Sequence, residues 1–282
     1  KVDDSGSELS LVCPFSHLPP SGTIPLQARL KNGTSQALEV TLNFATSQQY
    51  SMQGGVKRSH KTEITADPNQ TQTSYLLVPS ELVDVVAWGG ALNLSISSNS
   101  PTAENGGSSS IIGNSYGNDD YAFMAVSEEI YRFNGPLLAS AGNEFSRSEE
   151  SDAIASFIAK ELPPLAEAFT GVDLLMISDT EWSSLSADVR GAIKSWIVSG
   201  GNLVVAKIGG LSSPEALGIQ VEQSASTRKH TLGLGQINFV KIHPTNNRLD
   251  FSSIRNLPVG TNKLAWNNAP SSGADSLVDS II

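Results

Sequence analysis

The chain has 282 residues, of which 39% are hydrophobic and 16% charged, and its net charge is −10. This length suffices for two domains that each bury a core of their own. The acidic balance disfavours nucleic acids and anionic membrane surfaces as partners, because few cations would neutralise their phosphates. The single cysteine, Cys13, excludes an internal disulfide and a metal site built from several cysteines.

The compartment is indicated by composition. No apolar run approaches the ~20 residues that span a bilayer. The sequence begins with Lys1, so we expect a signal peptide or membrane anchor in segments missing from it. Few cysteines and a polar, lysine-poor surface are typical of bacterial extracytoplasmic proteins. We therefore expect a periplasmic or cell-surface location, with membrane attachment only through the missing segments.

The first half of the chain has the period-two pattern of strands. Residues 1–19 are expected to form an N-terminal extension, and residues 20–98 to form a domain of short strands. The stretch "ALEVTLNF" alternates apolar and polar side chains, and a turn is expected at Asn32-Gly33. Several short strands without helices between them predict an antiparallel β-sandwich of the immunoglobulin or fibronectin type.

A change of composition separates this half from the next. Residues 99–118 are rich in Gly, Ser and Asn, which predicts a linker or a long surface loop. Ile111 and Ile112 are its only apolar anchor points.

In the second half, residues 119–282, the pattern predicts alternating strands and helices. Strands are expected over 121–127 and 172–178 and in "NLVVA", and a helix over 151–164. A second helix is capped by Ser186, carries an apolar stripe through Trp196, and ends at Gly200-Gly201. This order predicts a parallel sheet in a three-layer flavodoxin-like α/β domain. The last thirty residues are expected to pack on a domain as an extension, anchored by Trp266.

One long segment carries a family resemblance. "FTGVDLLMISDTEWSSLSADVRGAIKSWIVSGGNLVVA" is similar to a recurring segment of the class I glutamine amidotransferase-like superfamily, and the resemblance spans about residues 121–244. With a β-sandwich in front and "GLGQINFVKIHP" behind, the chain resembles uncharacterised extracytoplasmic regions of bacterial membrane-anchored proteins. The resemblance implies the α/β fold, and many members of this superfamily lack catalysis.

The resemblance also implies where a nucleophile would stand. Active members carry a cysteine on the turn after the strand that "NLVVA" matches, and this turn here is Lys207-Ile208-Gly209-Gly210. His243 in "VKIHPT" would be the general base, but Thr245 stands where the orienting glutamate belongs. A base with neither a nucleophile nor an orienting carboxylate makes no triad. We therefore expect a protein without enzymatic activity or cofactor, with His243 as its one candidate catalytic residue.

Two further features are candidate sites. Asp179 and Glu181 follow the strand 172–178, and Glu128 with Glu129 follows the strand 121–127. Carboxylates at the ends of parallel strands would face each other and would suit Mg²⁺ or Ca²⁺. The alternative is a polar loop without a metal.

Trp182 has polar neighbours, so it is a possible contact for a protein or a glycan, or else is buried at the base of its loop.

Three functions remain open from the sequence. The first is a non-catalytic extracytoplasmic module that binds a protein or a cell-envelope component. The second is a hydrolase or amidotransferase-like enzyme with an unorthodox nucleophile, which rests on His243. The third is a carbohydrate-binding module, which rests on Trp88 or Trp182.

Overall fold

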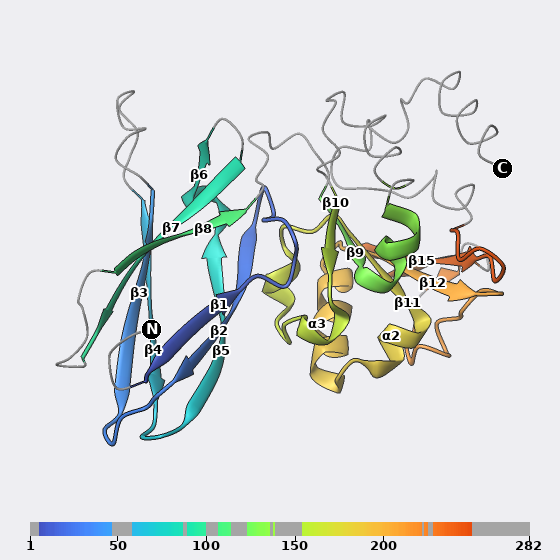
Figure 1. Ribbon diagram of the computed structural model, residues 1–282. Coiled ribbons are helices and arrows are strands. Elements are labelled where there is room, and N and C mark those ends of the chain that lie inside the picture. Colours follow the sequence, from blue (N-terminus) through green and yellow to red (C-terminus); the bar gives the residue numbers. More distant parts are fainter. Residues whose placement is uncertain are drawn as a thin grey trace. The chain divides into compact units, whose positions relative to one another are not determined.

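The computed structural model describes residues 6–46, 58–86, 89–99, 107–113, 123–135, 138, 154–221, 223–224 and 228–249. Strands predominate in it and helices are few, so the chain is of the mixed α/β type. It divides into two compact units, Lys1–Gly117 and Asn118–Ile282, which are shown together in Figure 1. The C-terminal segment with Trp266, and also Trp88, lie outside the described residues.

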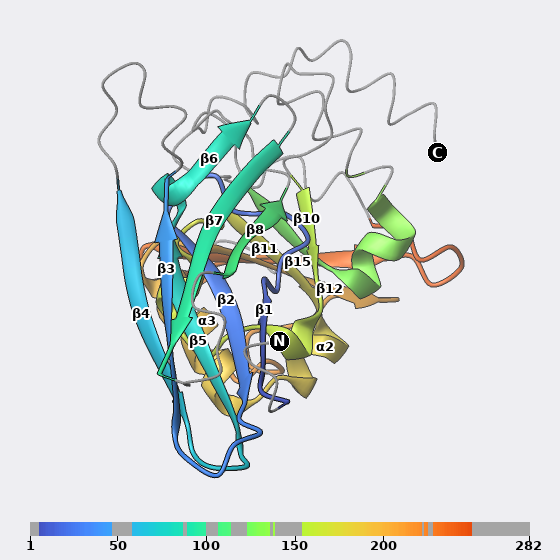
Figure 2. The same cartoon turned by 60° about the vertical axis from the view of Figure 1, so that its left-hand side comes forward.

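The first unit consists of antiparallel strands. One sheet has the order β1-β2-β5, and another has the order β4-β3-β7-β6 with β8 paired to β7 (Figure 2). The strands are β1 Glu8–Val12, β2 Thr23–Lys31, β3 Leu38–Ala45, β4 Ser59–Ala66, β5 Thr71–Pro79, β6 Val83–Val86, β7 Gly89–Ser98 and β8 Gly107–Gly113. A short 3₁₀ helix, η2, covers Ser80–Leu82.

The predicted alternation places one face of each strand in a common core. Leu38, Val40, Leu42 and Phe44 of β3 are buried, with Glu39 exposed between them. They belong to one apolar cluster with Ile24 and Leu26 of β2 and with residues of β4, β5 and β7. Both sheets of this unit therefore bury their apolar faces in the same core.

Two boundaries predicted for this half are wrong. Residues 8–12, expected in an N-terminal extension, form β1 and pair with β2 from Glu8↔Lys31 to Val12↔Gln27. Residues 107–113, expected in a linker, form β8, in which Ile111 and Ile112 pair with Leu92 and Ala91. A serine- and glycine-rich strand has little apolar periodicity. Its conformation is therefore set by pairing with β7 and not by the strand propensity of its residues.

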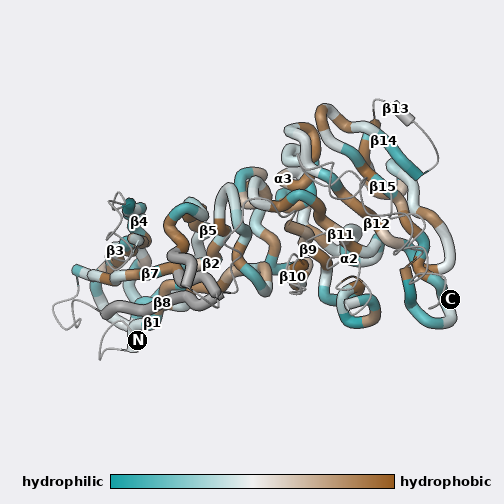
Figure 3. Tube along the Cα trace, turned by 90° about the horizontal axis from the view of Figure 1, so that it is seen from above, coloured by the Kyte–Doolittle hydropathy of each residue, from teal (hydrophilic) through white to brown (hydrophobic). Residues whose placement is uncertain are grey.

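The second unit is built on a sheet with the order β10-β9-β11-β12-β15-β14-β13. From β10 to β15 the neighbouring strands are parallel, and β14 and β13 continue the sheet antiparallel. The strands are β9 Met124–Ser127, β10 Ile154–Phe157, β11 Leu174–Ser178, β12 Asn202–Ile208, β13 Gln223–Ser224, β14 Lys229–Leu232 and β15 Gly235–Ile242. Figure 3 shows the hydrophobic colour along β9, β11 and β12 that buried parallel strands require.

Helices lie against this sheet. Residues 128–135 are helical, and Ile130 of this helix packs with Val126, Met176 and Val204. The other helices are α2 Asp179–Ser184, α3 Ala187–Val198 and the short 3₁₀ helices η3 Ala159–Glu161 and η4 Ala166–Phe169. The expected helix after Ser186 is confirmed: the Ser186 hydroxyl accepts from Val189 N, and Trp196 of the stripe is buried.

The predicted helix over 151–164 is wrong. Residues 154–157 form β10, which pairs in parallel with β9, and η3 follows. Ile154, Phe157 and Ile158 have a spacing that fits one face of a helix, but a short apolar run also fits a buried strand. In the structure Ile154 and Phe157 are buried, whereas Ile158 is exposed.

The amino-terminal edge of the parallel strands is closely packed. Leu234 N and Gln236 N, in the turn into β15 and at its start, donate to Val198 O and Gly201 O at the end of α3, at 2.9 and 3.2 Å. A Cβ on Gly235 would overlap the carbonyl oxygens of Ile197 and Gly201. The close approach of helix and strand therefore requires glycine at this position.

Candidate functional site

The carboxyl-terminal edge of the same strands is the position where a ligand site is expected. From β9 the chain passes to β10 on one side, and the next strand, β11, lies on the other side of β9. The direction of the connections thus reverses between β9 and β11. In open α/β sheets, ligands bind in the crevice beyond the carboxyl ends of the strands at such a reversal.

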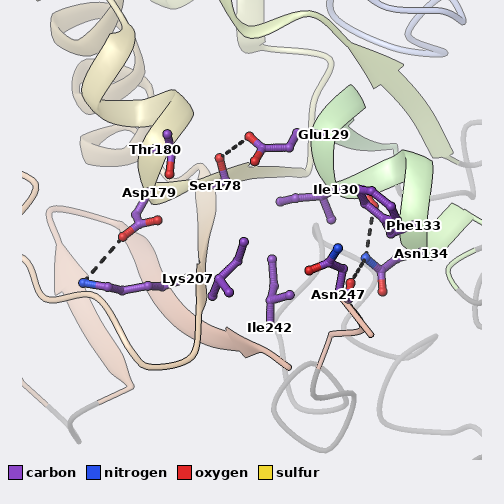
Figure 4. Close-up of a pocket in the computed structure, with 11 residues that line it drawn as sticks. Glu129, Ile130, Phe133, Asn134, Ser178, Asp179, Thr180, Lys207, Ile242 and Asn247 are labelled. Carbon is purple, nitrogen blue, oxygen red and sulfur yellow. Dashed lines mark hydrogen bonds and ion pairs between the residues drawn. The ribbon is translucent and has the colours of Figure 1, made fainter. Parts of the chain in front are cut away.

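A cavity of about 350 Å³ lies at this edge (Figure 4). This volume is at the lower end of the range that small-molecule sites occupy. The lining residues lie at the carboxyl ends of β9, β11, β12 and β15. Some are the last residues of these strands, and the others belong to the segments that follow them. They are Glu129, Ile130, Phe133, Asn134, Ser178, Asp179, Thr180, Lys207, Ile208, Ile242 and Asn247.

Ser178 links two carboxylates at the end of β11. Its hydroxyl accepts from Glu181 N at 3.1 Å, and Glu181 Oε2 accepts from Ser178 N at 3.2 Å, which together form a capping box for α2. The same hydroxyl lies 2.8 Å from Glu129 Oε2 and 3.0 Å from Glu181 Oε2. Its single proton can be donated fully to only one of these two acceptors.

Lys207 and Asp179 form the other charged contact of the cavity. Lys207 Nζ lies 3.6 Å from Asp179 Oδ2, and the two side chains are 42% and 23% exposed. In Figure 4 this pair lies across the cavity from Glu129. The charged residues that line the cavity are therefore two carboxylates and one ammonium.

The wall between these polar groups is apolar. Ile130 and Ile242 are buried beneath it, whereas Phe133 and Ile208 are 49% and 53% exposed. Arg132 places its guanidinium carbon 5.8 Å from the centroid of the Phe133 ring. This wall offers van der Waals contact to an aliphatic or aromatic part of a ligand.

Asn134 fixes one side of the cavity. Its amide Nδ2 donates to Ile130 O at 3.0 Å and to Asn247 O at 3.1 Å, and its Oδ1 accepts from Leu249 N at 2.9 Å. Asn134 is buried, and through these bonds the helix at 128–135 holds the segment that follows β15. Asn247 has a φ of 54°, a conformation that asparagine adopts more easily than most residues.

The carboxylates predicted from the sequence take different roles. Asp179 lines the cavity, and Glu181 belongs to the capping box. Glu129 lines the cavity, while its exposed neighbour Glu128 does not. Within the part of the chain that the structure describes, no three His, Cys, Asp or Glu side chains are grouped so that they could hold a metal ion.

Trp182 is not a contact surface, and that alternative of the sequence analysis is wrong. The indole is fully buried, and its Nε1 donates to Leu217 O at 3.1 Å. Because α2 begins directly at Asp179, the polar neighbours of Trp182 point outward while the ring enters the core. A carbohydrate-binding role for Trp182 is therefore excluded.

Neither the candidate base nor the cysteine is among the residues that line this cavity. His243 is exposed after β15, and only its backbone makes the bonds described, with Arg248 and Asn247. It is not among the residues that line the cavity. Cys13 belongs to the first unit, where burial raises the pKa of its thiol to about 12. Such a thiol is a poor nucleophile near neutral pH.

Sequence reasoning named Glu129 but missed Phe133 and Asn247, which also line the cavity. Glu129 and Phe133 are four residues apart on a helix that the sequence analysis did not predict, which places them on one face. Asn247 reaches the cavity only because the turn after β15 is tied to Asn134. The four-residue spacing of Glu129 and Phe133 is visible in the sequence, whereas the position of Asn247 depends on the folded turn and could not be predicted from it.

Comparison with known proteins assigns no family to this chain. No protein-family model matches the sequence, and no curated protein matches it. Similar solved structures include the β-glucosidase DesR from Streptomyces venezuelae in complex with D-glucose, at 13% identity and a TM-score of 0.25 over 38% of this chain and 15% of that one. A Paenibacillus cycloisomaltooligosaccharide glucanotransferase shares 14% identity at a TM-score of 0.28 over 74% and 29%. A Bacteroides uniformis β-glucuronidase shares 11% identity at 0.26 over 77% and 35%.

The chain thus spans between 15% and 35% of the length of these three structures. Their TM-scores are too low to assign a fold or an activity. No helix within the described ranges is long and apolar enough to cross a membrane.

Proposed function

We propose that this chain is a non-catalytic binding module with two domains. The first unit is an immunoglobulin- or fibronectin-like β-sandwich, supported by two antiparallel sheets that share one core. The second is flavodoxin-like, supported by the parallel order β10-β9-β11-β12-β15, which in chain order is 2-1-3-4-5. It is a non-catalytic relative of the class I glutamine amidotransferase-like superfamily that its sequence resembles.

The observation that carries the non-catalytic assignment is the end of β12. Where the resemblance places the cysteine of active members, the chain has Lys207, which lies within β12 and not on the turn expected at 207–210. Its amine lies 3.6 Å from the Asp179 carboxylate. The Ser178 hydroxyl, which also lines the cavity, is bound to carboxylates rather than to an imidazole. The imidazole that takes the proton in a Ser–His–Asp triad is therefore missing beside this hydroxyl.

The module acts outside the cytoplasm on a protein or a cell-envelope component, and segments beyond this sequence anchor it in the membrane. The net charge of −10 and the single cysteine support this location and this class of partner. The cavity at the carboxyl edge of the sheet offers a partner both charged groups and apolar surface.

The test is a search for covalent and hydrolytic chemistry. Purified protein is treated with a fluorophosphonate and with iodoacetamide, and is assayed with glutamine and with simple esters. We expect no fluorophosphonate labelling or turnover above the level of heat-denatured protein, no iodoacetamide labelling of the buried Cys13 thiol in the native protein, and no effect of His243→Ala. Labelling or turnover that His243→Ala abolishes would show that the chain is an enzyme.

A further inference from the structure

The cavity at the end of β9 and β11 carries unbalanced negative charge. Lys207 lies beside Asp179, and among the described residues that line the cavity there is no second cation for the Glu129 carboxylate on the opposite side. Its contact is the hydroxyl of Ser178 at 2.8 Å. Glu129 is also exposed, so a ligand can reach it from solvent.

The contact with Ser178 leaves this carboxylate incompletely satisfied. Ser178 is 5% exposed, and its hydroxyl lies within hydrogen-bond distance of both Glu129 and Glu181. One hydroxyl proton cannot satisfy two carboxylates at once. A hydrogen-bond donor with positive charge beside Glu129 would replace water at this exposed carboxylate and reduce the repulsion between the two acids.

The adjoining wall suits the apolar stem of such a donor. Phe133 follows Glu129 by four residues on the same helix, and its ring is half exposed. Aromatic faces attract cations, and Arg132 already lies 5.8 Å from the centroid of this ring. In Figure 4, Ile130 lies beside Glu129, and Ile242 lies at the cavity floor.

The same residues argue against an anionic ligand. Phosphate sites at strand ends use glycine-rich turns and free backbone N–H groups. Here Glu128 and Glu129 follow β9 directly, and the N–H of Glu181 is used by the Ser178 hydroxyl. A phosphate or carboxylate would meet two lining carboxylates and only one lysine.

From these contacts we infer that the cavity binds a primary ammonium group on an aliphatic stem, with Glu129 as its acceptor and Phe133 against the stem. The inference rests on the proposed function in one respect, since it names the chemistry by which the binding module recognises its partner. A free alkylamine and the side chain of a lysine in a partner protein share this chemistry.

The experiment compares matched probes on ¹⁵N-labelled full-length chain by NMR. Pentylamine, pentanol and pentanoate have the same carbon stem and differ in charge. We expect saturable shifts of the backbone amides of Glu129, Ile130 and Ser178 with pentylamine only, weaker at high salt. Acetyl-lysine methylamide, with its Nε-acetylated form as control, separates the two sources. Tighter binding of the lysine derivative than of pentylamine indicates that the ligand is a lysine side chain of a partner protein.

The decisive variant is Glu129→Gln, which keeps the shape and the acceptor for Ser178 but removes the charge. We expect it to weaken pentylamine binding about three- to fivefold, because an ion pair with an exposed carboxylate is worth up to about 1 kcal/mol. The matched control is Glu128→Gln, next to it and outside the cavity, which leaves binding within about twofold of the original. Unchanged thermal unfolding of both variants shows that the fold is intact.

Three outcomes overturn the inference. These are the absence of saturable shifts with pentylamine, equal weakening by both variants, and tighter binding of pentanoate that Lys207→Ala abolishes. Each of them leaves the non-catalytic assignment standing, because that assignment fails only when activity dependent on His243 is found.

Discussion

The two ends of β12 and β15 differ in how their neighbours are packed. At the amino ends, the backbone of Gly235 packs against the carbonyl oxygens of Ile197 and Gly201. Asp173, directly before β11, accepts a hydrogen bond from Phe123 N through its carboxylate and one from the Asn202 side chain through its backbone oxygen. At the carboxyl ends, polar side chains border a cavity of about 350 Å³. The same strands are therefore held at one edge by backbone contacts, while the other edge is left open to solvent.

This difference indicates that one edge of the sheet serves stability and the other serves binding. Close backbone contacts admit no additional atom, so substitutions there act on stability. Partly exposed side chains around a cavity contribute little to stability, so substitutions there act on binding. Three substitutions test this contrast.

The largest effect is expected for Gly235→Ala at the closed edge. The new Cβ would overlap the carbonyl oxygens of Ile197 and Gly201, which are backbone atoms and cannot rotate away. We expect a loss of at least about 3 kcal/mol in the free energy of unfolding, measured by urea denaturation.

Gly191→Ala is the matched control for this substitution. Gly191 lies within α3, and a Cβ there has no neighbour within 4 Å. This substitution should stabilise the protein by about 0.5–1 kcal/mol, because alanine favours a helix over glycine. Equal effects of the two substitutions would show that the close packing at Gly235 is not a constraint.

A smaller effect, visible through its pH dependence, is expected for Asp173→Asn. Burial raises the pKa of the Asp173 carboxyl above its ordinary value of 3.8, and the hydrogen bond from Phe123 N at 2.7 Å only partly opposes this. The folded state therefore binds a proton more tightly than the unfolded state. As the pH rises from about 3.8 through the folded-state pKa, ionisation of Asp173 costs stability.

Asparagine keeps the acceptor for Phe123 N and removes the ionisation. We expect the stability of Asp173→Asn relative to the unmodified protein to increase with pH across this window and then to become constant. Thermal unfolding from about pH 3 to about pH 7 measures this difference. A constant difference over the whole range would mean that the carboxyl is not desolvated at this edge.

The closed edge was easier to predict from the sequence than the open one. The Ser186 cap, the apolar stripe of α3 and Gly200-Gly201 are local signals, and the structure confirms them. The strands 172–178 and "NLVVA" were also predicted, because buried parallel strands are continuous apolar runs. The overlap at Gly235 was not predictable, because it depends on where α3 lies.

The open edge was predictable only in part. Asp179 was named as a site residue because it stands at the end of a recognisable strand, whereas Lys207, which also lines the cavity, was placed on a turn and was not named as one. Glu129 was named only beside Glu128, because its helix was not predicted and the exposed and lining faces could not be told apart. For Trp182 the sequence left a partner contact and burial both open, because polar neighbours indicate exposure only when the local conformation is known, and the structure shows it buried. Sites assembled from four strand ends depend on topology, which periodicity does not supply.

The smallest effect on stability is expected for Lys207→Ala at the open edge. The ion pair with Asp179 has a distance of 3.6 Å, and its side chains are partly exposed. Ion pairs of this kind contribute about 0–1 kcal/mol, because water solvates both charges when the pair is broken. Urea denaturation of Lys207→Ala, Asp179→Asn and the double variant should therefore give a coupling energy below about 1 kcal/mol. A coupling above about 2 kcal/mol would mean that the pair closes this edge much as the glycine contacts close the other, and the contrast between the two ends of the sheet would be lost.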